Sequence, residues 1–249
     1  MEKQPLLNTF VNNVDMKEAI NAIEKMIIEG GKHYIVAINV DVIVKLEDDI
    51  YLKEITDNAD MVLVDGQPLV WIAKWHKQPV KAKISGSDLV PVLCKKAADK
   101  NYTIFIIGGK NGIADKAKKN LEEKYPCIKI VGTYSPPLGF EKDNIELDKI
   151  NKIINKAHPD LLIVCFGCPK QEKWIYENYK NYNAKISICA GATVDFLAGN
   201  ISRAPRWMSN YGLEWFYRFL KEPKRMFRRY FIEDMKILRL VRKYRSVKW

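Results

Sequence analysis

The alternation of six short apolar runs with polar segments of helical length is the feature that most constrains the fold. The runs are HYIVAINV (33–40), MVLVD (61–65), YTIFIIGG (102–109), IKIVGTY (128–134), DLLIVCFG (160–167) and KISICAGA (185–192). Such runs, separated by amphipathic segments, are typical of parallel strands that helices cover. The sequence therefore predicts an α/β fold, a Rossmann-like and mostly parallel sheet flanked by helices.

The polar segments between these runs have helical periodicity. Helices are expected at Met16–Glu29, Ser87–Lys100, Gly112–Tyr125, Glu146–Ala157 and Lys170–Tyr179. Asp88 or Ser87 can cap the second of these helices and Asn111 the third. With 47% hydrophobic residues and no repeats or low-complexity linker, the sequence predicts one α/β catalytic domain over residues 1–200.

Positive charge is concentrated at the end of the chain. Residues 1–200 carry 27 Lys and Arg against 26 Asp and Glu, whereas residues 201–249 carry 14 against 4. The same last 49 residues hold 11 of the 27 aromatic side chains, and the segment KEPKRMFRRYF (221–231) mixes both kinds. A segment that is both basic and apolar suits a surface that is anionic and apolar, as a membrane is.

The basic segment predicts two helices, over 208–221 and 223–243, because Pro223 suits the first turn of a helix but not its interior. In the second helix, one apolar face is expected from Phe227, Phe231, Leu238 and Val241, flanked by Arg225, Arg228, Arg229, Arg239 and Arg242. Part of this face must pack on the sheet domain. The excess of charge predicts that residues 201–249 form a basic amphipathic appendage that associates with the membrane.

No stretch reaches the roughly 18 to 20 apolar residues of a spanning helix, and the N-terminal sequence has no basic-then-apolar signal. We therefore expect a cytoplasmic protein that is peripheral on the inner face of the cell membrane. The five cysteines, Cys94, Cys127, Cys165, Cys168 and Cys189, are an odd set expected to be thiols. The CxxC pair could be redox-active or half of a zinc site, but the three histidines are scattered, which favours structural roles.

The residues that follow each apolar run are the first candidates for a site, because parallel sheets bind ligands beyond the carboxyl ends of their strands. Asn39 and Asp41 stand at the end of the first run, and Asp65, the second residue of VDGQP, ends the second. A carboxylate on a tight turn at this edge is placed to act as a base. A turn cap explains this fragment as well, and the fragment alone favours it.

The later runs add groups that suit a phosphate or a sugar. Gly108 and Gly109 precede a helix, where backbone N–H groups can approach a phosphate, although turn geometry also explains them. Gln171 can bind sugar hydroxyls or cap its helix, and Asp195 can bind hydroxyls or cap a turn. Gly191 lets its loop pass close to a ligand. Together they suggest a nucleotide or sugar-phosphate ligand.

Eight motifs occur in order along the chain: VDGQP, SGSDL, GGKNG, SPPLGF, CPKQEKW, GATVDFLAG, APRW and GLEWFYRFLKEPKRMFRRY. In this order they resemble the WecG/TagA/CpsF glycosyltransferases (glycosyltransferase family 26). The resemblance implies transfer of N-acetylmannosamine from a UDP-sugar to a polyprenyl-diphosphate-linked sugar at the membrane. In wall teichoic acid linkage-unit synthesis, the implied acceptor is undecaprenyl-diphosphate-linked N-acetylglucosamine and the product a β-1,4 disaccharide. Glucose and N-acetylmannosaminuronic acid are alternative donor sugars.

The resemblance also implies roles for single residues. Asp65 is the implied base of an inverting reaction, and Arg218, Arg225 and Arg228 belong to an appendage that completes the active site over the diphosphate. The expected substrate-binding residues are Asn39, Gln67, Lys83, Gly108, Gly109, Gln171, Gly191 and Asp195. Ala37 stands where the family often has Thr, and Lys83 where it often has Arg. These departures bear on the donor sugar more than on the reaction class.

No Asp-x-Asp motif occurs in the sequence, so we expect catalysis without a divalent metal or another cofactor, with cations and backbone donors stabilising the leaving UDP. Two other classes stay open. One is a single-stranded nucleic-acid-binding protein that uses the basic aromatic tail, and the other is a non-catalytic membrane scaffold. Neither requires a polar edge around Asp65. Self-association through the apolar faces is possible in each case.

Overall fold

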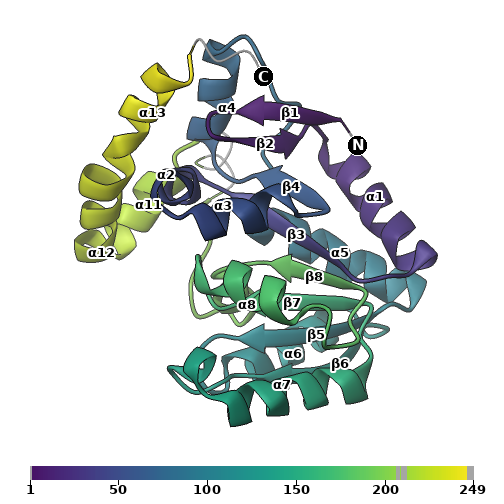
Figure 1. Ribbon diagram of the computed structural model, residues 1–249. Coiled ribbons are helices and arrows are strands. Elements are labelled where there is room, and N and C mark those ends of the chain that lie inside the picture. The colour runs from purple at the N-terminus through teal and green to yellow at the C-terminus, as the bar shows by residue number, and fades with distance from the viewer. Residues whose placement is uncertain (1, 206–207, 209–211, 246–249) are drawn as a thin grey trace.

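A six-stranded sheet forms the centre of the computed structural model, which describes residues 2–205, 208 and 212–245 but not the side chains of Arg218 and Arg225. All of its strands are parallel, in the order β4-β3-β8-β7-β5-β6 (Figure 1). The strands are β3 (His33–Ile38), β4 (Met61–Val64), β5 (Thr103–Gly108), β6 (Lys129–Tyr134), β7 (Leu161–Cys165) and β8 (Ile186–Cys189). The predicted α/β fold and each of the six predicted strands are confirmed.

The inner strands are largely apolar because both faces of the sheet are covered. In β3, Tyr34, Val36 and Ile38 belong to one buried cluster, while Ile35 belongs to the other. The same alternation runs through β4, β5 and β7. Successive residues of a strand point to opposite faces, so two hydrophobic layers require a continuous apolar run instead of an alternating one.

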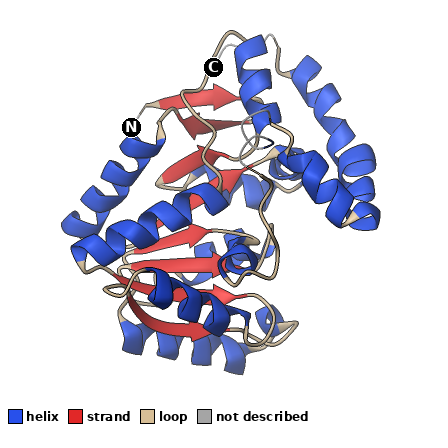
Figure 2. Ribbon diagram, turned by 180° about the vertical axis from the view of Figure 1, so that it is seen from behind, coloured by secondary structure: helices blue, strands red, loops and turns tan. Residues whose placement is uncertain are grey.

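Helices form a layer on each face of the sheet (Figure 2). One face is covered by α1 (Met16–Glu29), α5 (Gly86–Lys100), α6 (Ile113–Lys124) and α9 (Thr193–Leu197). The other is covered by α2 (Val40–Asp48), α3 (Ile50–Asp57), α4 (Gln67–Trp75), α7 (Asn144–Ala157) and α8 (Lys170–Asn178). The five expected helices are present within two residues of their predicted ends. Helices α2, α3, α4 and α9, and the short 3-10 helix η1 (Phe140–Lys142), were not predicted.

Two predicted helix caps are wrong. Helix α5 begins after Ser85, whose side chain accepts a hydrogen bond from the Asp88 backbone N–H at 3.1 Å, so neither Ser87 nor Asp88 is the cap. Helix α6 begins after Gly112, which has φ +76° and caps without a side chain, so Asn111 does not cap it. In both cases the conformation of the loop before the helix determines which residue is the cap.

A separate β-hairpin precedes the sheet. Its strands β1 (Lys3–Leu6) and β2 (Thr9–Asn12) pair antiparallel. The Asn12 side chain accepts a hydrogen bond from the Val62 backbone N–H at 2.7 Å, which joins the hairpin to β4 at the edge of the sheet. This hairpin covers an edge strand that would otherwise expose unpaired backbone groups.

The C-terminal segment lies along the sheet domain beside α2, as the yellow and pale-green helices of Figure 1 show. It comprises α11 (Glu214–Lys221), α12 (Pro223–Arg228), the π-helical turn η2 (Arg229–Glu233), the 3-10 turn η3 (Asp234–Lys236) and α13 (Ile237–Lys243). We call residues 212–245 the tail. Pro223 opens a helix as predicted, and the predicted boundary at residue 200 stays a prediction.

The tail does not keep the single apolar face expected from its sequence. Val241 is only 5% exposed and packs with Leu240 in the core cluster, whereas Phe227, Phe231 and Leu238 are 53%, 49% and 58% exposed. Leu238 and Val241 lie in the same helix, α13, so the expected single face divides within that helix, with Val241 turned to the sheet domain and Leu238 turned away from it. The tail therefore has an inner apolar contact near its end and a separate exposed apolar surface.

Candidate active site

Three cavities open near the carboxyl edge of the sheet. From β3 the chain first forms the edge strand β4 and then passes to β5 in the other half of the sheet. The direction of strand addition therefore reverses next to β3, whose other neighbour is β8. Open α/β sheets bind ligands at such a point. Asn39 follows β3, Asp65 follows β4 and Gly191 lies shortly after β8, so the topology brings these three predicted site residues to one edge.

The first cavity, here the polar cavity, has a volume of about 250 Å³. Asn39, Asp65, Gln171 and Gly191, all predicted from the sequence, line it together with Arg229. The loop after β7 and the first turn of α9 complete its wall. Its size and polar lining suit a compact ligand rich in hydroxyl groups.

The second cavity, here the aromatic cavity, lies between the sheet domain and the tail and has a volume of about 390 Å³. Its apolar wall is formed by Trp71 of α4 and by the tail residues Trp215, Tyr230, Phe231 and Met235. Gln67 and Lys83 also line it. Three residues line both this cavity and the polar one: Asn39, Asp65 and Arg229.

The backbone around Asn39 and Asp65 fixes both side chains at this shared wall. Asn39 caps α2, since its side chain accepts a hydrogen bond from the Val42 backbone N–H at 3.1 Å. The Asp65 backbone N–H donates to the Ile38 carbonyl at 2.7 Å, which continues the pairing of β4 with β3. Gly66 follows at φ +116°, a conformation that favours glycine. The Asp65 backbone is therefore held by the sheet, and its side chain lines the wall that the two cavities share.

Arg229 brings a positive charge from the tail to the same junction. Its Nη2 lies 3.4 Å from the Asn39 side-chain oxygen and 3.7 Å from an Asp41 carboxylate oxygen, and its Nε lies 3.8 Å from Asp234. The Lys45 ammonium pairs with Asp41 at 2.8 Å. Two cations and two carboxylates thus lie together where the tail meets α2.

Asp234 is the tail carboxylate of this group. Burial raises the pKa of Asp234 to about 6; Arg229 and Lys45 oppose the rise, whereas Asp41 and Glu233 add to it. One of its carboxyl oxygens is buried without a hydrogen-bond partner. Asp234 is therefore a poorly solvated acid at the docking surface of the tail.

Gln171 and Glu172 form a buried polar pair at the floor of the polar cavity. The Gln171 amide nitrogen donates to a Glu172 carboxyl oxygen at 2.8 Å, and the Gly191 backbone N–H donates to the Gln171 side-chain oxygen at 3.0 Å. Burial raises the pKa of Glu172. Gln171 does not cap its helix, which begins after Pro169 without a side-chain cap. It fixes the Gly191 loop against the cavity.

The third cavity, here the glycine-loop cavity, has a volume of about 750 Å³ and is lined by Gly108, Gly109 and Asp195, all predicted, and by Lys110. A Cβ atom on Gly108 would lie 2.4 Å from the Cys165 carbonyl oxygen, so close strand contact explains this glycine without a ligand. Burial raises the pKa of Asp195, and the Lys110 charge opposes that rise. The loop 165–168 lines this cavity at its start and the polar cavity at its end.

Lys83 connects the sheet domain to the tail. Its ammonium lies 3.2 Å from Asp88 and 3.6 Å from Glu214 of α11. Arg203 also donates a hydrogen bond to Asp88. Burial raises the pKa of Asp88, but the hydrogen bonds from Arg203 and Ser85 outweigh this effect and lower the pKa to about 2. Lys83 lines the aromatic cavity while paired, and its phosphate role stays a prediction.

Of the three arginines predicted to complete the site, the structure describes the side chain of Arg228 alone, so their joint role stays a prediction. Arg228 is exposed and pairs with Glu233 of the tail at 2.9 Å. The side chains of Arg218 and Arg225 lie outside the described residues. Instead, the structure places Arg229 at the junction, a residue that the sequence indicated only as a flank of the apolar face. No local signal separates it from Arg228, because the π-helical turn that directs it inward depends on tertiary packing.

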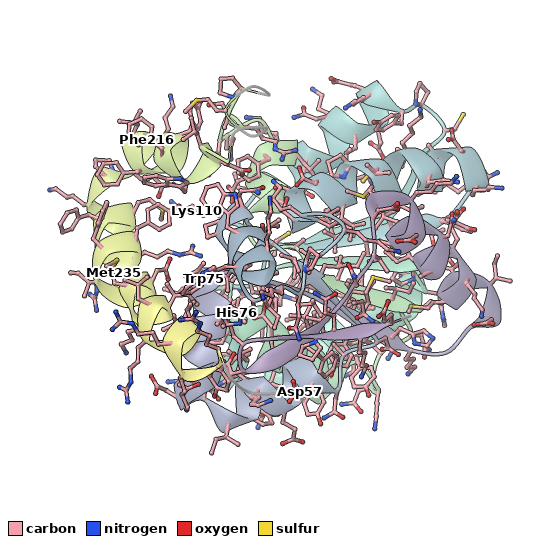
Figure 3. The ribbon with its side chains drawn as sticks, turned by 90° about the horizontal axis from the view of Figure 1, so that it is seen from above. Asp57, Trp75, His76, Lys110, Phe216 and Met235 are labelled. Atoms are coloured by element: carbon pink, nitrogen blue, oxygen red, sulfur yellow. The ribbon has the colours of Figure 1, made fainter. Side chains whose placement is uncertain are left out.

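The exposed surface of the tail continues the aromatic cavity outward. Phe231, Met235 and Trp215 line the cavity and are also exposed. Phe227, whose ring lies 5.2 Å from that of Phe231, is exposed as well, as are Ile232 and Leu238. Figure 3 shows the tail as a column beside the sheet domain, with Phe216 and Met235 labelled on it. We call these apolar residues of the tail its outer face.

All five cysteines are free. Burial raises the pKa of the Cys165 and Cys168 thiols, so the CxxC pair has no reactive thiolate. Within residues 2–205, 208 and 212–245, no three His, Cys, Asp or Glu side chains are grouped as metal ligands. Of the helices in this described part, none combines the length and apolarity needed to cross a bilayer.

The parallel sheet, with a polar and an aromatic cavity at its carboxyl edge and Asp65 at the wall they share, is the arrangement expected of an α/β enzyme. A profile of the glycosyl transferase WecG/TagA/CpsF family matches residues 4–249. The chain belongs to this family of glycosyltransferases, as its motifs predicted.

Two relatives carry the same name, N-acetylglucosaminyldiphosphoundecaprenol N-acetyl-beta-D-mannosaminyltransferase. The protein of Bacillus subtilis (strain 168) is 30% identical over 227 residues, which are 90% of this chain and 86% of the relative. The protein of Bacillus spizizenii (strain ATCC 23059 / NRRL B-14472 / W23) is 27% identical over the same lengths.

Proposed function

We propose that this protein is an inverting glycosyltransferase that moves N-acetylmannosamine from its UDP-sugar to undecaprenyl-diphosphate-linked N-acetylglucosamine. The names of its Bacillus relatives support this donor sugar and this acceptor. The observation that carries the proposal is the place of Asp65, at the wall shared by the polar and aromatic cavities. A transferase needs its base between a sugar donor and a separate acceptor, and this wall provides that position.

The donor is proposed to occupy the glycine-loop cavity and the polar cavity together. Their combined wall follows the loop 165–168, so one extended ligand can pass from one to the other. The larger cavity suits the nucleotide and the polar one suits the hexose. Ala37 lines the polar cavity with a small apolar side chain, so the site allows other hexoses as well.

The acceptor is proposed to enter through the aromatic cavity. Its Trp and Tyr side chains suit a sugar ring, and its continuation into the outer face of the tail suits a prenyl chain that stays in the bilayer. This arrangement favours a lipid-linked acceptor over a free sugar or a nucleic acid. It also favours a protein that works at the membrane surface, with the outer face buried among lipids.

In the proposed reaction, the Asp65 carboxylate takes the proton from the acceptor 4-hydroxyl group. The acceptor oxygen then bonds to C1 of the donor sugar, while the bond from C1 to the diphosphate oxygen breaks and UDP leaves with the electron pair. Attack from the face opposite the leaving group inverts the configuration at C1 and gives a β-1,4 linkage. Cationic side chains of the tail, with Arg218, Arg225 and Arg228 as candidates, balance the charge on UDP without a metal ion.

Release of UDP from UDP-N-acetylmannosamine tests the reaction, measured with and without a prenyl-diphosphate-N-acetylglucosamine analogue in EDTA. Acceptor-dependent release in EDTA supports the reaction class, the donor and the metal-free mechanism together. Release only after Mg²⁺ or Mn²⁺ is restored would contradict the metal-free step. Release from UDP-glucose or UDP-N-acetylmannosaminuronic acid instead would keep the reaction class and replace the donor.

Replacement of Asp65 tests the proposed base. Asp65→Asn keeps the shape of the side chain but removes its ability to accept a proton, so turnover should fall by about 100-fold or more while UDP still binds. Asp99→Asn, on an exposed face of α5, is the matched control. Turnover of Asp65→Asn within twofold of the unmodified protein would exclude Asp65 as the base.

A further inference from the structure

Arg229 differs from the other basic side chains of the tail that the structure describes. The others are exposed, namely Lys221, Lys224, Arg228, Lys236, Arg239, Arg242, Lys243 and Arg245, whereas the Arg229 side chain is 28% exposed and lines both cavities at the Asp65 wall. The sequence places all nine arginines between residues 203 and 245. The sheet domain therefore has no guanidinium of its own at this junction, and the tail supplies one.

The contacts of Arg229 are long for charged partners. Its distances to Asn39, Asp41 and Asp234 are 3.4, 3.7 and 3.8 Å, whereas charge-assisted hydrogen bonds of this kind are about 2.7 to 2.9 Å. The Nε atom is buried without a hydrogen-bond partner. A buried donor without a partner costs free energy, so a ligand that supplies an acceptor here gains affinity.

The helix is distorted where Arg229 occurs. Arg229 is the first residue of the π-helical turn 229–233, between two segments of other helical type. π-helical turns are rare in proteins, and those that do occur are often found at functional sites. They redirect a side chain away from the regular helical face. Arg229 points inward at this turn, whereas the preceding residue Arg228 is exposed.

We propose that Arg229 binds phosphate oxygens of a diphosphate-bearing substrate at the junction of the polar and aromatic cavities. The inference rests on the proposed function, which places a diphosphate in both substrates. The planar guanidinium fork matches two phosphate oxygens, which an ammonium group does not. The diphosphate belongs either to the nucleotide donor or to the lipid-linked acceptor, and both reach this junction from opposite sides.

In the structure, Asp41 and Asp234 are the carboxylates that face the Arg229 guanidinium. Their contacts are loose enough to be exchanged for phosphate oxygens without a large loss. When Arg229 turns toward a phosphate, Asp234 loses its nearest cation, and its raised pKa lets it take a proton and stay buried. Asp41 keeps its pairing with Lys45 at 2.8 Å. Substrate binding and tail docking are thus coupled through one side chain.

Direct binding measurements test this inference without requiring turnover. The full-length protein and its variants Arg229→Gln and Arg229→Lys are titrated in a calorimeter with UDP and with geranyl diphosphate. Lys119→Gln, which removes one charge from an exposed side chain of α6, is the control. Thermal unfolding of each variant establishes that it is folded, and Arg229→Lys, which keeps the charge, remains informative if Arg229→Gln is not.

Arg229→Gln should weaken binding of one of the two ligands by about tenfold to 100-fold, and Arg229→Lys by less. Weaker UDP binding assigns Arg229 to the donor, and weaker geranyl diphosphate binding assigns it to the acceptor. Unchanged affinity for both ligands overturns the inference, as does an equal loss in Lys119→Gln. If the unmodified protein binds UDP but transfers no sugar, the proposed function fails while the loss of affinity in Arg229→Gln still supports the phosphate role.

Discussion

Replacing Asp234 by Asn should stabilise the docked tail near pH 8, although the change removes an ion pair. The pKa of Asp234 rises from 3.8 to about 6 in the folded protein. Since one pKa unit corresponds to about 1.36 kcal/mol, ionised Asp234 destabilises the docked state by about 3 kcal/mol relative to a neutral side chain. The carboxylate is buried beside Asp41, and Arg229 at 3.8 Å compensates only in part.

The sign of the pH dependence follows from the raised pKa. Below pH 3.8 the carboxyl is protonated in both states, so Asp234→Asn should have little effect there. Between pH 3.8 and about 6 the unfolded state ionises first, so the stability of the unmodified protein falls as the pH rises. The advantage of Asp234→Asn should be about half of its full size near pH 5 and complete above pH 7.

Urea unfolding at pH 5 and pH 8 measures this difference, with tryptophan fluorescence as the signal because Trp71 and Trp215 line the cavity under the tail. Limited proteolysis of the tail gives a second, local measurement. Asp99→Asn, an exposed control on α5, should change neither. A variant that is less stable at pH 8, or whose difference does not depend on pH, would refute the argument.

Three further changes test the packing and the surface. In urea unfolding, Gly108→Ala should lower the free energy of unfolding by about 3 kcal/mol, because the new Cβ would lie 2.4 Å from the Cys165 carbonyl oxygen. Gly139 also has a positive φ but lies in open space, so Gly139→Ala should lower the free energy of unfolding by only about 1 kcal/mol. Ser85→Ala should lose about 1 kcal/mol with its α5 cap in the same assay. Leu238→Glu on the outer face should reduce sedimentation with anionic liposomes at least several-fold; unchanged sedimentation would contradict membrane binding by that face.

The strands were predictable because their signal is local. An apolar run of five to eight residues indicates a strand that is buried on both faces. This signal depends on the residues of the strand itself and not on which strand lies beside it. Helices with a clear stripe, such as α1 and α7, were predictable for the same reason. Helix α2 was missed because it begins at Val40, within the apolar run that forms β3, so no break in the run marks its start. Helix α4 was missed although Gly66 and Pro68 mark its start, because the turn there indicates an isolated loop equally well.

The candidate site was predictable in part. Asn39, Asp65, Gln171 and Gly191 follow apolar runs, and parallel topology alone brings such residues to one edge. The exposed position of Arg228 and the inward position of Arg229 could not be predicted, because adjacent arginines in a basic helix carry the same local signal. The meeting of Asp234 with Asp41 joins residues that are far apart in the chain, and no sequence period encodes such a contact.

The sequence by itself determined the six strands, five of the helices that cover them and the basic aromatic character of the tail, because each of these follows from the order of polar and apolar residues over short distances. Only the tertiary structure decided which tail residues face the sheet domain. Within α13, Val241 packs inward and Leu238 stays exposed, and in the π-helical turn 229–233 Arg229 reaches Asn39. Contact with α2 selects the inward side of the tail, and that contact exists only in the folded chain.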